Sequence, residues 1–131
     1  MRRVVAIVLL LSACRADPAD VLGAARRALA SRDDAAFLAL CEPRAAELLT
    51  AASNVVAQSG HVFKVLRDGR PTPRLLPDGE VLTVEENGHR AIVVTRSRKP
   101  GGRVPMRLVE GQWRIDLLEM PQFADAIRPE R

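Results

Sequence analysis

Few side chains in this chain of 131 residues have both the type and the setting that chemistry requires. The chain has two cysteines, two histidines and no tyrosine. Cys14 has the most informative setting, because it stands three residues after an apolar run, Val4 to Leu11, and this run follows Arg2 and Arg3. A charged start, a short apolar stretch and small residues at a cleavage point are the layout of a secretory signal peptide. We therefore expect processing at or near Cys14.

The apolar run is too short to cross a bilayer, since its eight residues would cover roughly 12 Å of helix against about 30 Å of hydrocarbon. The four residues at the end of the run and just after it, Leu11-Ser12-Ala13-Cys14, resemble the lipobox of bacterial lipoproteins, in which the cysteine is lipidated and becomes the first mature residue. The resemblance implies a diacylglyceryl group on the Cys14 thiol, and two or three acyl chains make a stable membrane anchor. The alternative is cleavage after Ala16 by an ordinary signal peptidase.

This interpretation predicts a cell-envelope protein attached to a membrane by lipid. Arg15 follows Cys14 at the position where an aspartate often marks inner-membrane retention, so the resemblance favours the outer membrane, facing the periplasm or the surface, in a Gram-negative host. Without Arg2 and Arg3 the chain has 18 Lys+Arg against 16 Asp+Glu, which is only weakly basic. The predicted parts are a signal peptide (1–13), the lipidated cysteine with a short linker (14–17), one domain (18–120) and a tail (121–131).

The first half of the domain is predicted to be helical. Asp17 and Pro18 begin a first helix, Asp33 or Asp34 caps a short second helix, and Pro43 begins a third that ends at Ser59-Gly60. Cys41 lies in an apolar helical stretch and, with Cys14 lipidated, is expected to be a small buried hydrophobe. The apolar positions of the third helix fall on one face: Leu48, Leu49, Ala52, Val55 and Val56.

The second half of the domain is predicted to form strands. Residues 61–67 form a strand closed by Asp68-Gly69, and 70–79 form a loop or an irregular edge. The strands 80–86 and 89–96 flank Asn87-Gly88, a strong hairpin signal that would place Glu86 opposite His89. Further in, both faces of this hairpin are apolar, so we expect it to be central in the sheet.

A last hairpin is predicted for residues 103–110 and 113–119 across Gly111-Gln112. This register places Arg107 opposite Asp116, whereas moving the turn back by one residue would oppose Arg107 and Arg114, which is unfavourable. A short helix around Phe123 to Ile127 follows. One face of the hairpin is apolar: Val104, Met106, Leu108, Trp113, Ile115 and Leu117.

Helices followed by an antiparallel meander indicate an α+β domain. Two segments, Ala25 to Pro43 and Leu108 to Glu119, resemble the NTF2-like (ketosteroid isomerase-like) family. The resemblance implies N-terminal helices packed on a curved antiparallel sheet in a cone fold, with a pocket open at one end. The wall of that pocket is then expected to include Phe37, Leu40, Trp113 and Ile115, with a packed core as the alternative.

No catalytic residue is assigned. Enzymes of that family use a pocket Asp or Glu with a Tyr, His or protonated Asp, and here His61 and His89 stand at a strand start and a hairpin tip. The best candidates for an inward carboxylate are Asp34 and Glu42, which flank the short helix of Phe37. No metal-ligand spacing and no phosphate-binding glycine loop occur, so no metal or cofactor is expected.

A basic cluster surrounds one loop and consists of Arg96, Arg98, Lys99, Arg103 and Arg107. It is either a solvated sheet end or a contact for anionic lipid headgroups or an acidic partner. Aromatic residues make up 3% of the chain, too few for a stacking surface, so nucleic acid is not an expected partner.

The sequence thus predicts a non-catalytic binding domain on a lipid anchor, with a small apolar ligand or an envelope protein as its partner. Two alternatives stay open: an enzyme of the ketosteroid isomerase or polyketide cyclase type, and a structural envelope protein with a filled core.

Overall fold

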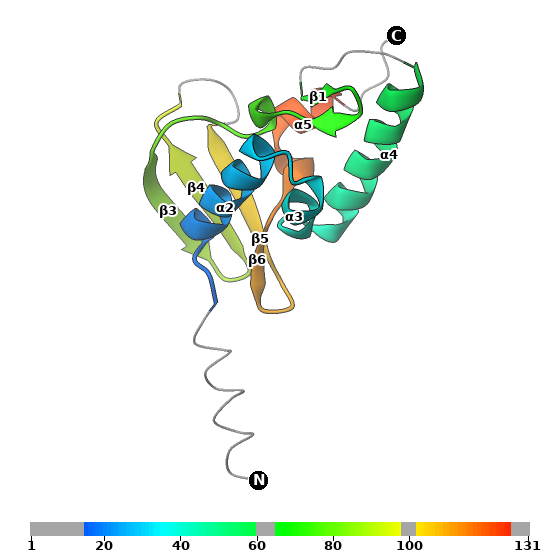
Figure 1. Ribbon diagram of the computed structural model, residues 1–131. Helices are drawn as coiled ribbons and strands as arrows, with labels where there is room; N and C mark the ends of the chain where they lie inside the picture. The colour runs from blue at the N-terminus through cyan, green and yellow to red at the C-terminus, as the bar shows by residue number, and fades with distance from the viewer. Residues whose placement is uncertain (1–14, 60–64, 98–101, 127–131) are drawn as a thin grey trace.

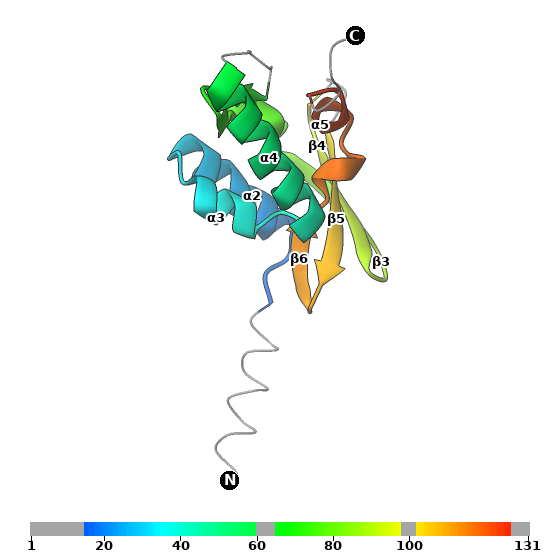
Figure 2. The same ribbon diagram turned by 90° about the vertical axis from the view of Figure 1, so that its right-hand side faces the viewer.

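A computed structural model describes residues 15–59, 65–97 and 102–126, and the side chains of 124–126 are not described. Cys14 and the predicted signal peptide therefore lie outside the described residues. The domain is α+β: three helices precede a four-stranded antiparallel sheet (Figure 1). Figure 2 shows α2, α3 and α4 on one side of this sheet, whose other face they leave open.

The helices begin where the sequence predicts. They are α2 (Pro18–Ala30), α3 (Asp34–Ala39) and α4 (Pro43–Ser59). Proline suits the first helical position because its missing N–H has no partner there in any helix. Asp33 caps α3 by accepting a hydrogen bond from the backbone N–H of Ala36 at 3.1 Å. None of the described helices is both long and apolar enough to span a membrane.

The predicted apolar face of α4 is wrong in part. Leu48 and Val55 are 45% and 58% exposed, whereas Ala45, Leu49 and Val56 are buried. These buried residues, spaced four and seven positions apart, form one narrow stripe along α4. Only this stripe is fully buried, because α4 lies at the edge of the domain. Leu48 and Val55 consequently face solvent, and Ala52 is half-buried against the core.

Between α4 and the main sheet lies a small hairpin of β1 (Leu66–Arg67) and β2 (Arg70–Pro71), followed by the 3-10 helix η1 (Pro73–Leu75). The turn at Asp68-Gly69 is as predicted, and both residues have positive φ. Residues 61–64 of the predicted strand lie outside the described part. A Cβ at Gly69 would stand 2.8 Å from the Cβ of Ala57, so glycine lets this hairpin contact α4.

The main sheet has the order β3-β4-β5-β6, with β3 (Val81–Asn87), β4 (Arg90–Thr95), β5 (Arg103–Val109) and β6 (Gln112–Ile115). The prediction that the first hairpin is central is confirmed for β4, which pairs with both β3 and β5, and wrong for β3, which is an edge strand. Its side chains Leu82 and Val84 are 48% and 37% exposed, whereas Val81 is half-buried against the core.

Both hairpin turns lie one residue from their predicted positions, which shifts each predicted strand pairing by two residues. The first turn is Gly88-His89, so Glu86 lies opposite Ala91 instead of His89. Only the glycine of this turn has positive φ, which is the pattern of a type II′ turn. The second turn is Glu110-Gly111, and positive φ at both residues is the pattern of a type I′ turn. Turn geometry therefore decided these registers.

The core lies between the sheet and α2 and α3. The predicted apolar face of the last hairpin is confirmed, with Leu108 half-buried and its other members buried. Beyond β6 the chain continues through η2 (Leu117–Glu119) to α5 (Pro121–Ala126), near the predicted tail helix. The backbone of Leu40–Glu42 lies along β6: Ile115 N–H donates to Leu40 O and Glu42 N–H donates to Ile115 O, each at 2.8 Å.

Candidate functional site

The four residues predicted to line a pocket lie in the packed core. Phe37 and Ile115 are fully buried, Trp113 is 4% exposed, and Leu40 is half-buried against the same cluster. These side chains belong to or pack against the same hydrophobic core. None of them lines the surface hollow described below. These four residues therefore form part of a packed core, which was the alternative to a pocket wall.

The described members of the predicted basic cluster each contact a carboxylate. Arg96 pairs with Glu80 at 2.6 Å and Arg103 with Glu85 at 2.9 Å, both at exposed sites. Arg107 Nε lies 3.5 Å from Oδ2 of the buried Asp116. Arg98 and Lys99 fall outside the described residues. Exposed ion pairs of this kind contribute little stability, but they neutralise the arginines that form them.

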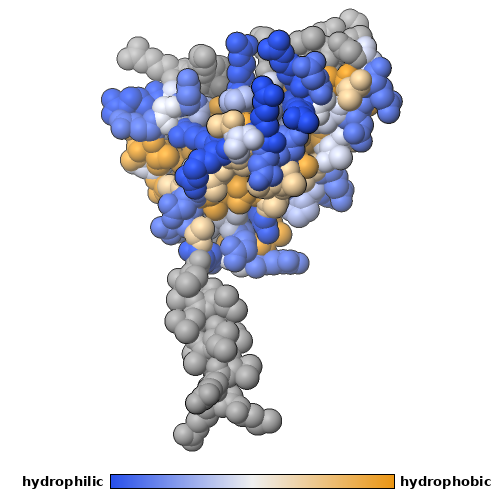
Figure 3. Space-filling view, viewed as in Figure 1, coloured by the Kyte–Doolittle hydropathy of each residue, from blue (hydrophilic) through white to orange (hydrophobic). Residues whose placement is uncertain are grey.

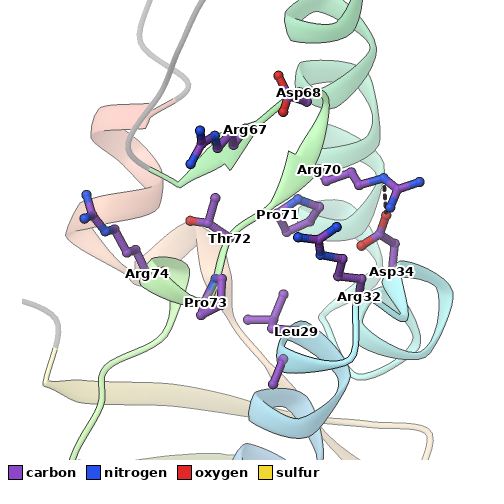
Figure 4. Close-up of a pocket in the computed structure, with 11 residues that line it drawn as sticks. Leu29, Arg32, Asp34, Arg67, Asp68, Arg70, Pro71, Thr72, Pro73 and Arg74 are labelled. Carbon is purple, nitrogen blue, oxygen red and sulfur yellow. Dashed lines mark ion pairs between the residues drawn. The ribbon is translucent and has the colours of Figure 1, made fainter.

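A different group of arginines surrounds an open hollow of about 1210 Å³ (Figure 4). It lies between the C-terminal end of α2 and the segment β1–β2–η1. Figure 4 shows Arg67 and Arg74 on one side of the backbone at Thr72, and Arg32 and Arg70 on the other. The lining residues are Leu29, Ala30, Arg32, Asp34, Arg67, Asp68, Arg70, Pro71, Thr72, Pro73 and Arg74.

Local backbone geometry places these arginines. Arg32 has φ +59° in the turn that joins α2 to α3, and its side chain lines the hollow. The segment after the hollow is fixed to α2, because the guanidinium of Arg26 donates two hydrogen bonds, of 2.7 and 3.1 Å, to Pro77 O. Buried Leu75 and Leu76 hold η1 on the core. The hollow is thus built on anchored backbone.

The charges at the hollow do not cancel. Four arginines face two aspartates, Asp34 and Asp68, and the one ion pair among the described lining residues joins Arg70 Nε to Asp34 Oδ2 at 3.9 Å. Arg32, Arg67 and Arg74 form no ion pair with another described residue. Guanidinium groups present planar, paired N–H donors that match carboxylate and phosphate oxygens. The arrangement can therefore bind an anionic group.

The distribution of surface residues agrees with this location. On the face that carries α2, hydrophilic side chains gather toward the end of the molecule where α2 finishes, while apolar surface lies nearer the middle (Figure 3). The hollow is thus in the more polar part of this face, at the opposite end of α2 from the chain's N-terminal segment (Figure 1).

The two carboxylates considered for acid–base chemistry have structural contacts. Asp34 lies at the hollow, 36% exposed and paired with Arg70. Glu42 is 9% exposed and its Oε2 accepts a hydrogen bond from the N–H of Ala45 at 3.2 Å, which caps α4. Asp116, predicted as a partner of Arg107, is that partner, although not through the predicted register.

Cys41 is a buried thiol, as predicted, but it follows α3 instead of lying within a helix. It is 3% exposed, its Sγ donates to Phe37 O at 3.4 Å, and burial raises its pKa from 9.0 to about 12. A thiol with so high a pKa is a poor nucleophile. Among the described residues, no group of three or more His, Cys, Asp or Glu side chains could hold a metal ion.

The arginine hollow was not predicted from the sequence. A signal was present, since Arg67, Arg70 and Arg74 recur within eight residues of a proline-rich segment. Arg32, 35 residues before Arg67, could be added only by the fold. Comparisons with protein-family models, with curated proteins and with solved structures found no match.

Proposed function

We propose that this protein is an exported lipoprotein whose domain binds an anionic group, a carboxylate or a phosphate, in the arginine hollow. The proposal places the lipid on Cys14 after removal of residues 1–13, with the domain held at a membrane of the cell envelope. The layout of the first fourteen residues supports the anchor. The three arginines of the hollow without an acidic partner among the described residues support the anionic ligand.

The position of the hollow fits an anchored binding protein. Helix α2 has 13 residues, a length of about 20 Å, and the hollow lies at its far end from the N-terminal segment. A lipid on Cys14 would therefore leave the hollow facing the aqueous compartment, open to a soluble ligand or an acidic segment of another protein.

The apolar ligand expected from the sequence has less support. Its proposed wall, including Phe37 and Trp113, is packed into the core. That closed core is what the alternative of a structural envelope protein requires, so this remains the second candidate. For the fold, helices over one face of a twisted antiparallel sheet support a proposal of the NTF2-like cone within the observed α+β class.

The binding proposal is tested with inorganic pyrophosphate and with succinate as probes, using isothermal titration calorimetry on the full chain in detergent. We expect binding that weakens about tenfold or more in the double variant Arg32→Gln/Arg74→Gln, since charge-assisted hydrogen bonds contribute roughly 1.5–3 kcal/mol each. Arg44→Gln/Arg96→Gln removes the same charge from exposed sites elsewhere and should leave the affinity unchanged. Equal losses in both variants, or no binding of either probe, would contradict the proposal.

The anchor is tested by mass spectrometry of the mature protein. We expect a diacylglyceryl-modified N-terminal cysteine, and loss of both the modification and the membrane association in Cys14→Ser. An unmodified mature N-terminus at Asp17 would refute the lipoprotein proposal and leave the ligand proposal standing.

A further inference from the structure

Three arginines lie side by side across three neighbouring strands. The strand pairing places Arg90 opposite Arg107 and Arg107 opposite Arg114. We call these three residues the arginine row. Their chain neighbours Ala91 and Met106 are buried on the helix side, so the row lies on the open face of the sheet, because successive side chains of a strand point to opposite faces.

Charge within the row is not balanced. Like charges directly opposite one another on a sheet are unfavourable, and the row places three cations in a line. Among the described residues only Asp116 forms an ion pair with the row, at 3.5 Å from Arg107. Arg90 is exposed and Arg114 is half-buried, and neither forms an ion pair with another described residue. An external anion could satisfy these two guanidinium groups.

The acidic residues nearby do not change this balance. Glu86 and Glu110 are exposed near the two hairpin turns, but neither is paired with the row. Glu86 lies opposite Ala91, and therefore on the other face of the sheet from Arg90. Glu85 shares the open face but is paired with Arg103 at 2.9 Å.

The row lies at the end of the domain where the chain enters. Arg90 directly follows the turn Gly88-His89, and Arg107 and Arg114 are close to the turn Glu110-Gly111. Figure 1 shows both turns at the same end of the molecule as residues 15–17 and the start of α2. The four residues 14–17 reach at most about 14 Å. A lipid on Cys14 would hold this end, and not the arginine hollow, next to a membrane.

We propose that the arginine row binds the phosphates of anionic phospholipid headgroups and so orients the anchored domain on its membrane. The orienting role rests on the proposed lipid anchor. Guanidinium groups bind phosphate oxygens in pairs, and adjacent strands about 4.8 Å apart spread the row over roughly 10 Å, room for more than one headgroup. Each arginine close to an anionic surface strengthens binding about fivefold, so the row contributes up to about 150-fold.

The test uses the full chain with Cys14→Ser, so that acyl chains do not dominate the binding. Its partition is measured by co-sedimentation with vesicles of phosphatidylcholine alone and with phosphatidylglycerol added. We expect the ratio of the two partition coefficients to fall about 100-fold in Arg90→Gln/Arg107→Gln/Arg114→Gln. The matched control Arg27→Gln/Arg44→Gln/Arg96→Gln removes the same charge from exposed sites outside both the row and the hollow, and should keep most of the ratio.

Equal losses in the two triple variants would show that net charge alone acts, and an unchanged ratio in the row variant would show that the row does not contact lipid; either result overturns the proposal. Should the row variant fail to fold, the single change Arg90→Gln at an exposed side chain is expected to lower the ratio about fivefold. Because the assay omits the lipid on Cys14, its outcome is independent of the mass-spectrometric test of the anchor.

Discussion

Arg107 lies directly opposite Arg114 in the pairing of β5 with β6, and its guanidinium Nε is 3.5 Å from Asp116 Oδ2. Asp116 is 6% exposed, and burial raises the pKa of its carboxyl above the ordinary value of 3.8. The positive charge of Arg107 opposes this rise, while the negative charges of Glu119 and Glu42 add to it. The fold thus keeps a carboxylate at a desolvated site beside like-charged arginines.

The raised pKa predicts how stability depends on pH. A carboxyl whose pKa is raised by folding stabilises the fold fully below its unfolded pKa, and this contribution is lost as pH rises through the folded pKa. Asp116→Asn removes the titration. We expect the free energy of unfolding of the wild type, measured with urea, to increase relative to that of the variant as pH falls from about 7 to about 4. The opposite trend would mean that the pairing with Arg107 outweighs desolvation.

Glu42 is predicted to stabilise the start of α4. It precedes Pro43, and its Oε2 accepts the N–H of Ala45 at 3.2 Å. Loss of such a cap costs about 1 kcal/mol, so Glu42→Ala should lower the free energy of unfolding by that amount in chemical denaturation. Glu42→Gln keeps an acceptor oxygen and should retain most of the stability. If Gln and Ala are equally destabilising, the charge of Glu42 matters more than its hydrogen bond.

Trp113 is predicted to carry a large part of the stability of the sheet. It is 4% exposed and lies opposite Leu108 on the helix-covered face. Replacing a buried aromatic by alanine costs about 3–5 kcal/mol, which for a domain of this size lowers Tm by roughly 10 °C or more. Circular dichroism during heating measures the change. Leu48→Ala, at a side chain that is 45% exposed, is the control and should shift Tm only slightly.

Cys41 is predicted to be unreactive in the folded protein. Its thiol is buried and its pKa is raised to about 12, so almost no thiolate is available at pH 8. In the Cys14→Ser chain, iodoacetamide should modify Cys41 only after urea is added, as followed by mass spectrometry. Rapid modification without urea would show that the backbone at Leu40–Glu42 opens from β6 in the native state.

Local signals determined much of the fold in advance. Asp17-Pro18, Asp33 and Pro43 set the helix starts because capping and the fixed φ of proline act within one turn of helix. Alternation of apolar and polar residues identified the buried face of the last hairpin, including Trp113, because the side-chain period of a strand does not depend on its partner. The α+β class followed from the order of these elements.

Tertiary structure alone decided which residues meet. The hairpin registers depended on backbone φ at Glu110 and Gly88, and a shift of the second turn by one residue placed Arg107 opposite Arg114 instead of Asp116. That β3 is an edge strand was decided by the pairing order of the sheet, in which β3 pairs only with β4. Arg32 joined Arg67, Arg70 and Arg74 around the hollow because long-range packing brings the end of α2 to the β1–β2 hairpin. The hollow forms only when the end of α2 packs near the β1–β2 hairpin, and the arginine row is complete only when β4 pairs with β5, so no local pattern could specify either in full.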